Sequence, residues 1–352
     1  MSLDFLEKFL EKNTPSGQEK IGQVMWAEEA RKYAKVTTDV TGNVIATLST
    51  DLRATSTTVM LAGHCDEIGV IVTYITDDGY AHFAEIGGVD LELLQGTRIV
   101  FEKCTGVIGK RPVHLSDEDD EKKILRAKNL WIDIGAKNKK QTLEYLPIGS
   151  MGCVSTGVHK LLNGLITCKG IDNKVGSYAV LRALEKIHKK IKKLKVKVVV
   201  VSTVQEEIGL YGAKVSAYGI RPDAAIAVDV SFATDTPEED DKKICGDVRL
   251  GRGPIIAVGP TMNNVLRNML IKSAEKHKIE VQHTAEPAGY AGTDADSIRL
   301  SRGGVATTLV SIPTRYIHTP VEVCSLDDIE KTATLIAETL LSMPAKPDFS
   351  PF

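Results

Sequence analysis

Residues 196–209 read VKVVVVSTVQEEIG, and this stretch does most to determine the predicted fold. Its first half is a short run of β-branched apolar residues, which is typical of a strand covered on both faces. Runs of the same kind occur at 57–61, 224–228 and 305–310. Helical patterns lie between these runs. The sequence therefore predicts an α/β fold with a doubly wound, mostly parallel sheet and helices on both sides.

Two of the intervening helices carry clear signals. In the stretch after residue 172, apolar residues recur at i, i+4, i+7 and i+11 and form one buried stripe: Val180, Leu184, Ile187 and Ile191. The last helix is expected to begin at Ser325, with Asp328 three residues later completing a capping box.

The middle of the chain, from about residue 70 to about residue 165, has a different pattern. Short β-type runs alternate there with turn signals, at Asp78-Gly79, Gly87-Gly88, Gln95-Gly96 and Gly109. We expect a small all-β, barrel-like domain at 69–164, inserted between two parts of the α/β domain at 1–68 and 165–352. The charged stretch at 116–123 is interpreted as a solvated loop.

The composition is typical of a soluble globular protein. The 352 residues are 43% hydrophobic and 26% charged with a net charge of -2, so no electrostatic feature favours nucleic acid or a membrane surface as partner. The apolar runs are shorter than the roughly 20 residues of a membrane-spanning helix. Six scattered cysteines and an amphipathic N-terminus without a secretory pattern favour a cytoplasmic location.

Five short segments place an acidic residue or a histidine where a predicted strand ends. They are GHCDEIG, KGIDNKVG, STVQEEIG, AVDVS and RYIHTP, and they carry His64 with Asp66, Asp172, Glu206 with Glu207, Asp229 and His318. In open parallel sheets, ligands bind outside the carboxyl ends of the strands. A single such residue is usually a loop polar group or a helix cap, but five together predict one shared site.

The charges of this set favour two divalent cations. Five carboxylates in one pocket would repel one another, whereas two divalent ions would balance three ligand carboxylates and one hydroxide. Histidine nitrogen with carboxylate oxygen suits zinc, cobalt or manganese. We expect Glu207 to bind metal, Glu206 to accept the proton of the attacking water, and Asp66 to hydrogen-bond a ligand imidazole.

The order of these motifs resembles that of a known family. His-x-Asp, Asp-Asn-Lys-x-Gly, Glu-Glu-x-Gly, Val-Asp and Ile-His-Thr-Pro, with GYAGTDADSI at 289–298 and the β-type insertion, are similar to the tetrahedral aminopeptidases. These are di-metal exopeptidases that include glutamyl, leucyl and lysyl aminopeptidases, and some members carry an endoglucanase label. The resemblance covers essentially the whole chain. Two positions depart from the familiar pattern: Lys174 stands where Arg is common, and Cys65 where Met is common.

The resemblance implies a role for each site residue. Asp172 would bridge two metal ions, His64 and Asp229 would complete one site, and Glu207 and His318 the other. Glu206 would be the general base and Asp66 a supporting catalytic residue. The substrates would be peptides. The inserted domain would mediate dimer contacts, and six dimers would form a hollow dodecamer.

Other functions remain open at this stage. A related di-metal carboxypeptidase or deacylase would use the same order of ligand types, although Asp-Asn-Lys-x-Gly and the place of the insertion favour the aminopeptidase. An endoglucanase would need two carboxylates flanking a glycosidic bond, and a non-catalytic scaffold would not need both glutamates. Asp294 and Asp296 fit either a capped helix start or a substrate contact, whereas His82, His114 and His159 lack ligand spacing.

Overall fold

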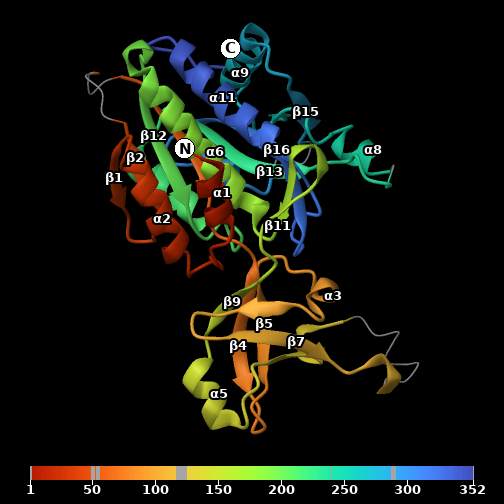
Figure 1. The fold of residues 1–352 in the computed structure, drawn as a ribbon. Coiled ribbons are helices and arrows are strands. Elements are labelled where there is room, and N and C mark those ends of the chain that lie inside the picture. The colour runs from red at the N-terminus through yellow and green to blue at the C-terminus, as the bar shows by residue number, and fades with distance from the viewer. Residues whose placement is uncertain are drawn as a thin grey trace.

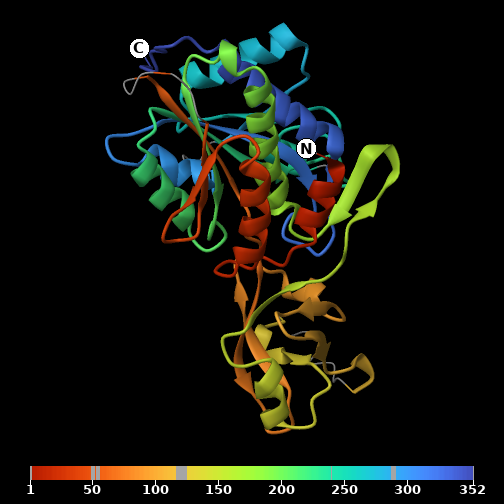
Figure 2. The ribbon, with the colours of Figure 1, turned by 60° about the vertical axis from the view of Figure 1, so that its left-hand side comes forward.

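The computed structural model describes residues 2–48, 52, 56–115, 125–238, 240–286 and 291–351. An α/β body and a smaller β body lie one above the other, and the chain crosses between them twice (Figures 1 and 2). The charged stretch interpreted as a loop at 116–123 lies outside the described residues.

A large mixed sheet forms the centre of the α/β body. Within the described chain it has eleven strands. Four central strands run parallel in the order β12, β3, β13, β16, and they correspond to the four apolar runs predicted from the sequence. Antiparallel strands flank this centre on both sides. The bounds are β1 Lys35–Thr38, β2 Val44–Thr47, β3 Thr58–His64, β10 His159–Lys160, β11 Leu165–Cys168, β12 Lys197–Thr203, β13 Ala224–Phe232, β14 Ile255–Val258, β15 Gln282–Ala285, β16 Ala306–Arg315 and β17 Glu322–Ser325.

Helices cover both faces of this sheet. Alternate residues of β3 point to opposite sides, so Val59 and Leu61 pack with one hydrophobic cluster while Met60 and Ala62 pack with another. Residues of α1, α2, α6, α9 and α11 build the first cluster, and residues of α7 and α10 contribute to the second. The bounds are α1 Leu3–Leu10, α2 Lys20–Ala30, α6 Ile171–Lys189, α7 Tyr211–Ile220, α8 Asp241–Cys245, α9 Asn264–His277, α10 Asp294–Arg299 and α11 Leu326–Ser342.

The β body is a closed antiparallel barrel, as expected for the insertion. Its strands follow the order β4, β5, β8, β7, β6, β9, and β9 pairs with β4 to close it. Apolar side chains such as Val72, Phe83 and Ile132 fill the interior. The bounds are β4 Gly69–Ile75, β5 Ala81–Ile86, α3 Leu91–Leu94, β6 Arg98–Val100, β7 Thr105–Lys110, β8 Leu130–Asp133, α5 Lys139–Tyr145 and β9 Met151–Val154. The predicted domain boundaries at 68/69 and 164/165 stay a prediction.

Two local predictions were wrong. The Ser325 side chain makes no capping hydrogen bond at the start of α11. Asp328 does not complete a capping box, because its carboxylate accepts hydrogen bonds from the backbone N–H groups of Gly251 and Gly253, each at 2.7 Å. Gly109 is not a turn residue but lies inside β7, where an added Cβ would stand 2.7 Å from the indole nitrogen of Trp131.

The helical stripe predicted after residue 172 lies largely on α6. Val180, Leu184 and Ile187 are fully buried, whereas Ile191 follows the end of this helix. Within the described residues, no helix combines the length and apolar character needed to cross a membrane.

Candidate metal centre and active site

The parallel strands deliver three of the five predicted segments to one edge of the sheet. His64 is the last residue of β3, Asp229 lies near the end of β13, and Glu206 and Glu207 follow β12. Because β12, β3 and β13 run parallel, their carboxyl ends lie side by side. This convergence is the one expected for residues at the carboxyl ends of neighbouring parallel strands.

Asp172 and His318 lie at the same edge of the sheet, but they do not follow strands of the parallel centre in the same way. Asp172 follows β11, which is antiparallel to its neighbour β17, and it lies in the first turn of α6. The next residue, Asn173, fixes that turn, because its amide donates to the carbonyl oxygen of Val228 at 2.8 Å. His318 lies in the loop between β16 and β17, with φ of +64° in the left-handed region.

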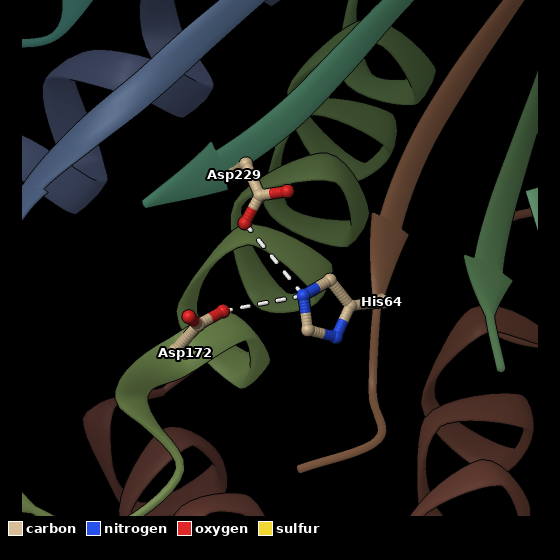
Figure 3. A group of neighbouring side chains, drawn as sticks. All are labelled: His64, Asp172 and Asp229. Atoms are coloured by element: carbon tan, nitrogen blue, oxygen red, sulfur yellow. Dashed lines mark ion pairs between the residues drawn. The ribbon is translucent and has the colours of Figure 1, made fainter. Parts of the chain in front are cut away.

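These residues form two groups that share Asp172. In the first group, Nε2 of His64 lies 3.2 Å from Oδ1 of Asp172 and 3.6 Å from Oδ1 of Asp229 (Figure 3). In the second, Nε2 of His318 lies 3.4 Å from Oδ2 of Asp172 and 3.3 Å from Oε2 of Glu207. In each group, the ligand atoms all lie within 4.8 Å of one another, as a metal ion requires. The two oxygens of Asp172 thus face different histidines.

The adjacent glutamates point to different partners. Oε2 of Glu206 lies 3.7 Å from Nε2 of His64, whereas Glu207 faces His318. Asp66 links the two, because its carboxylate accepts hydrogen bonds from the backbone N–H groups of Glu206 at 3.1 Å and Glu207 at 3.2 Å. It contacts the His64 imidazole chiefly through its main-chain carbonyl, to which Nδ1 donates at 3.1 Å, while the carboxylate stands 3.4 Å away.

Burial and mutual repulsion govern the charges of the protein side chains here. Burial, with the nearby charge of Asp172, raises the pKa of Glu207 to about 7, and burial with neighbouring carboxylates raises the pKa of Glu206 well above its usual range. Burial likewise raises the pKa of Asp229. Two contacts with Asp172 and Glu207 raise the pKa of His318 to about 11. The group therefore attracts positive charge strongly.

A cavity of about 610 Å³ opens onto both groups. Apart from the two histidines, its described lining residues include no basic side chain. The Oε1 atom of Glu207 is buried and has no hydrogen-bond partner within the described residues. Such a buried acceptor is costly unless it is paired, so a cation beside Glu207 fits the donor set on chemical grounds.

The structure also adds a residue that the sequence reasoning missed. Glu322 is 2% exposed, and its carboxylate accepts the backbone N–H of Asp172 at 3.0 Å and that of His318 at 2.9 Å. It therefore fixes the main chain at two of the grouped residues. The Ile-His-Thr-Pro motif contains a signal for it, since Glu322 follows that motif within two residues.

The remaining candidates contribute no atom to either group. Asp294 begins α10, which Thr293 caps, and it accepts the hydroxyl of Thr203 at 2.5 Å, so the interpretation as a helix start is confirmed. Asp296 accepts backbone N–H groups of its own loop. The metal-type groups of the described chain include none of the histidines at 82, 114 and 159.

Comparison with known proteins identifies the family. The model of the M42 glutamyl aminopeptidase family matches residues 42–335. The chain belongs to the M42 glutamyl aminopeptidase family. It is a peptide hydrolase, and the resemblance drawn from the motifs is confirmed.

Individual known aminopeptidases match this chain along nearly its whole length. The lysyl aminopeptidase of Pyrococcus furiosus is 33% identical over 356 residues, which cover 99% of each protein. The TET aminopeptidase of Thaumarchaeota archaeon SCGC AB-539-E09 has a similar structure, with a TM-score of 0.90, 29% identity and coverage of 97% of this chain and 96% of that one. PhTET1-12s, a dodecamer in its crystal, gives a TM-score of 0.84 at 31% identity, covering 97% and 100%.

Proposed function

We propose that this M42 protein removes N-terminal residues from peptides with two divalent cations held by the two groups. His64, Asp172 and Asp229 would hold one cation, and Asp172, Glu207 and His318 the other. The observation that carries the proposal is the placement of Asp172, whose two carboxylate oxygens face the Nε2 atoms of different histidines at 3.2 and 3.4 Å. One carboxylate in this position can serve two ions.

The cations, when bound, polarise the scissile carbonyl and lower the pKa of water at the site. Glu206 supplies the base, because its carboxylate lies beside the first group without belonging to either set of ligand atoms. Asp66 keeps Glu206 and Glu207 pointing apart by holding both backbone N–H groups. Glu206 then returns the proton to the leaving amine.

The cavity suits the free end of a peptide. Besides the proposed cation ligands, its described lining carries Glu206 and Glu286 but no lysine or arginine, so a protonated substrate amine is attracted and a C-terminal carboxylate finds no basic side chain. This charge distribution favours aminopeptidase over carboxypeptidase activity. N-acylated amino acids, which lack that positive charge, would gain nothing from these carboxylates.

Replacing the proposed base tests the assignment. Glu206→Gln keeps the shape of the side chain but removes the proton acceptor, so we expect turnover to fall by about 10²- to 10⁴-fold while both cations stay bound. Metal content is measured by atomic emission after dialysis, and turnover with an aminoacyl anilide. Glu275→Gln, on the exposed face of α9, is the matched control and should behave as the wild type. Wild-type turnover in Glu206→Gln would remove this residue from the mechanism.

The cation identity, the assembly and the compartment are part of the same proposal. Zinc or cobalt suits the nitrogen and oxygen ligands, with manganese as an alternative. The similarity to PhTET1-12s supports a dodecameric assembly, which we propose to consist of six dimers. Native mass spectrometry measures the number of subunits directly. All six cysteines are free thiols, as in a reducing cytoplasm.

A further inference from the structure

The barrel reaches the metal centre of its own chain through the turn after β5. This turn contains Gly87 and Gly88, and the carbonyl oxygen of Gly88 lies 3.0 Å from Nδ1 of His318. The two residues are 230 positions apart in the chain. Figures 1 and 2 show the barrel beneath the α/β body, with β5 in its upper part.

The donor and the acceptor of this hydrogen bond are fixed by the chemistry of the two groups. A carbonyl oxygen can only accept a hydrogen bond, so Nδ1 of His318 must carry the proton. When the imidazole is neutral, as it must be to bind a cation, Nε2 then has the free lone pair on the side that faces Asp172 and Glu207. An imidazole must be in this tautomer to bind a cation through Nε2, and the group bonded to the other nitrogen decides which tautomer forms.

The contact depends on the absence of side chains in the turn. A Cβ at Gly88 would stand 3.0 Å from Nδ1 and 3.3 Å from Cε1 of His318. A Cβ at Gly87 would stand 2.8 Å from Cγ2 of Ile68 and 3.4 Å from Cβ of Glu207, and φ at this residue is +76°. The turn therefore packs directly against His318 and Glu207, which both belong to the second group.

We propose that the Gly87–Gly88 turn is a positioning element of the second cation site, through which the barrel sets the orientation and the tautomer of His318. The inference rests on the proposed two-cation function and adds to it. His318 is held from two sides, because Glu322 accepts its backbone N–H at 2.9 Å and Gly88 accepts its side-chain N–H. Displacing the turn lowers the cation affinity of the second site and leaves the cation affinity of the His64 site unchanged.

Gly88→Ala in the full-length protein tests this. The added methyl group pushes the imidazole away, so we expect the second zinc ion to bind about 10- to 100-fold more weakly, and the first within about twofold of wild type. The two zinc affinities are measured by titration against a competing chelator, with dialysis and atomic emission for stoichiometry. Gly303→Ala is the matched control, because a Cβ there meets nothing within 4 Å and φ is not in the left-handed region.

The double variant Gly88→Ala/His318→Ala shows whether the effect passes through the histidine. We expect His318→Ala to bind one zinc ion per subunit, and Gly88→Ala to add nothing in that background. Unchanged second-site affinity in Gly88→Ala, or equal weakening of both sites, would overturn the inference while the two-cation function stands. A wild-type protein that binds only one zinc ion would instead refute the proposed function, and the inference with it.

Discussion

Glu67 holds two buried lysines, and its replacement should destabilise the fold. Its Oε1 atom accepts hydrogen bonds from Nζ of Lys169 at 2.7 Å and Nζ of Lys174 at 2.6 Å, and from the backbone N–H of Thr14 at 2.8 Å. All three charged side chains are at most 7% exposed. The contact joins the first chain crossing between the bodies to the connection between β11 and α6 and to the first turns of α6, where Asp172 lies.

The magnitude follows from the pKa of the carboxyl group. Burial alone would raise the pKa of Glu67, but Lys169 and Lys174 outweigh it and lower the pKa from 4.5 to about 2. At about 1.4 kcal/mol for each pH unit, this difference corresponds to about 3 kcal/mol of folding free energy at neutral pH. Removing one partner of a buried ion pair typically costs about 3–5 kcal/mol, and this range agrees with the value obtained from the pKa.

We therefore expect Glu67→Gln to lower the free energy of unfolding by about 3 kcal/mol, measured by urea denaturation at pH 7 and fixed protein concentration. Glu280→Gln, which breaks the exposed pair with Arg252, is the control and should cost less than about 1 kcal/mol. Because the folded-state pKa is lowered, the stabilisation by Glu67 is complete above pH 4.5 and is lost as the pH falls towards 2. The difference between wild type and Glu67→Gln should shrink over the same interval. A loss below 0.5 kcal/mol at pH 7, or one independent of pH down to 2, would refute the reasoning.

Two further changes test the packing and the hydrogen bonds around the site. Gly63→Ala would place a Cβ 2.7 Å from the carbonyl carbon of Gly176, so we expect a loss of about 1–3 kcal/mol in urea denaturation. Gly219→Ala, in α7 with open space around it, should be neutral or slightly stabilising, and equal effects of both would contradict the packing argument. Asp66→Asn turns an amide N–H₂ towards backbone donors, so zinc affinity should fall by about 10- to 100-fold in the chelator titration. Unaltered affinity would show that the Asp66 carboxylate does not support the metal centre.

Residues at the ends of parallel strands could be predicted from sequence because periodicity locates such strands. His64, Asp229 and the paired glutamates converge for this reason, since β3, β13 and β12 lie side by side. Asp172 lies with them although it follows β11, which is antiparallel to β17, so the direction of parallel strands does not explain its position. The assignment of Glu207 as ligand and Glu206 as base stays a prediction, because adjacent residues share every local sequence signal.

Contacts between residues far apart in the chain could not be predicted from the sequence. Lys174 stood out only as a departure from the familiar Arg, and nothing local pairs it with Glu67, 107 residues earlier. The contact between Gly88 and His318 likewise depends on how the barrel sits against the α/β body, which no periodicity encodes. Asp328 is a further example. The local sequence pattern predicts that its carboxylate caps a helix, but the carboxylate instead accepts hydrogen bonds from Gly251 and Gly253 in a distant loop.

The most direct test of the central claim is hydrolysis of paired substrates by metal-depleted and metal-restored protein. A panel of free-amine aminoacyl anilides and their N-acetylated partners is assayed after chelation and again after zinc, cobalt or manganese is added back. A two-cation aminopeptidase should show no cleavage after chelation and restored cleavage of the free-amine series alone. Cleavage of the acetylated series alone, or cleavage that survives metal removal, would contradict this function.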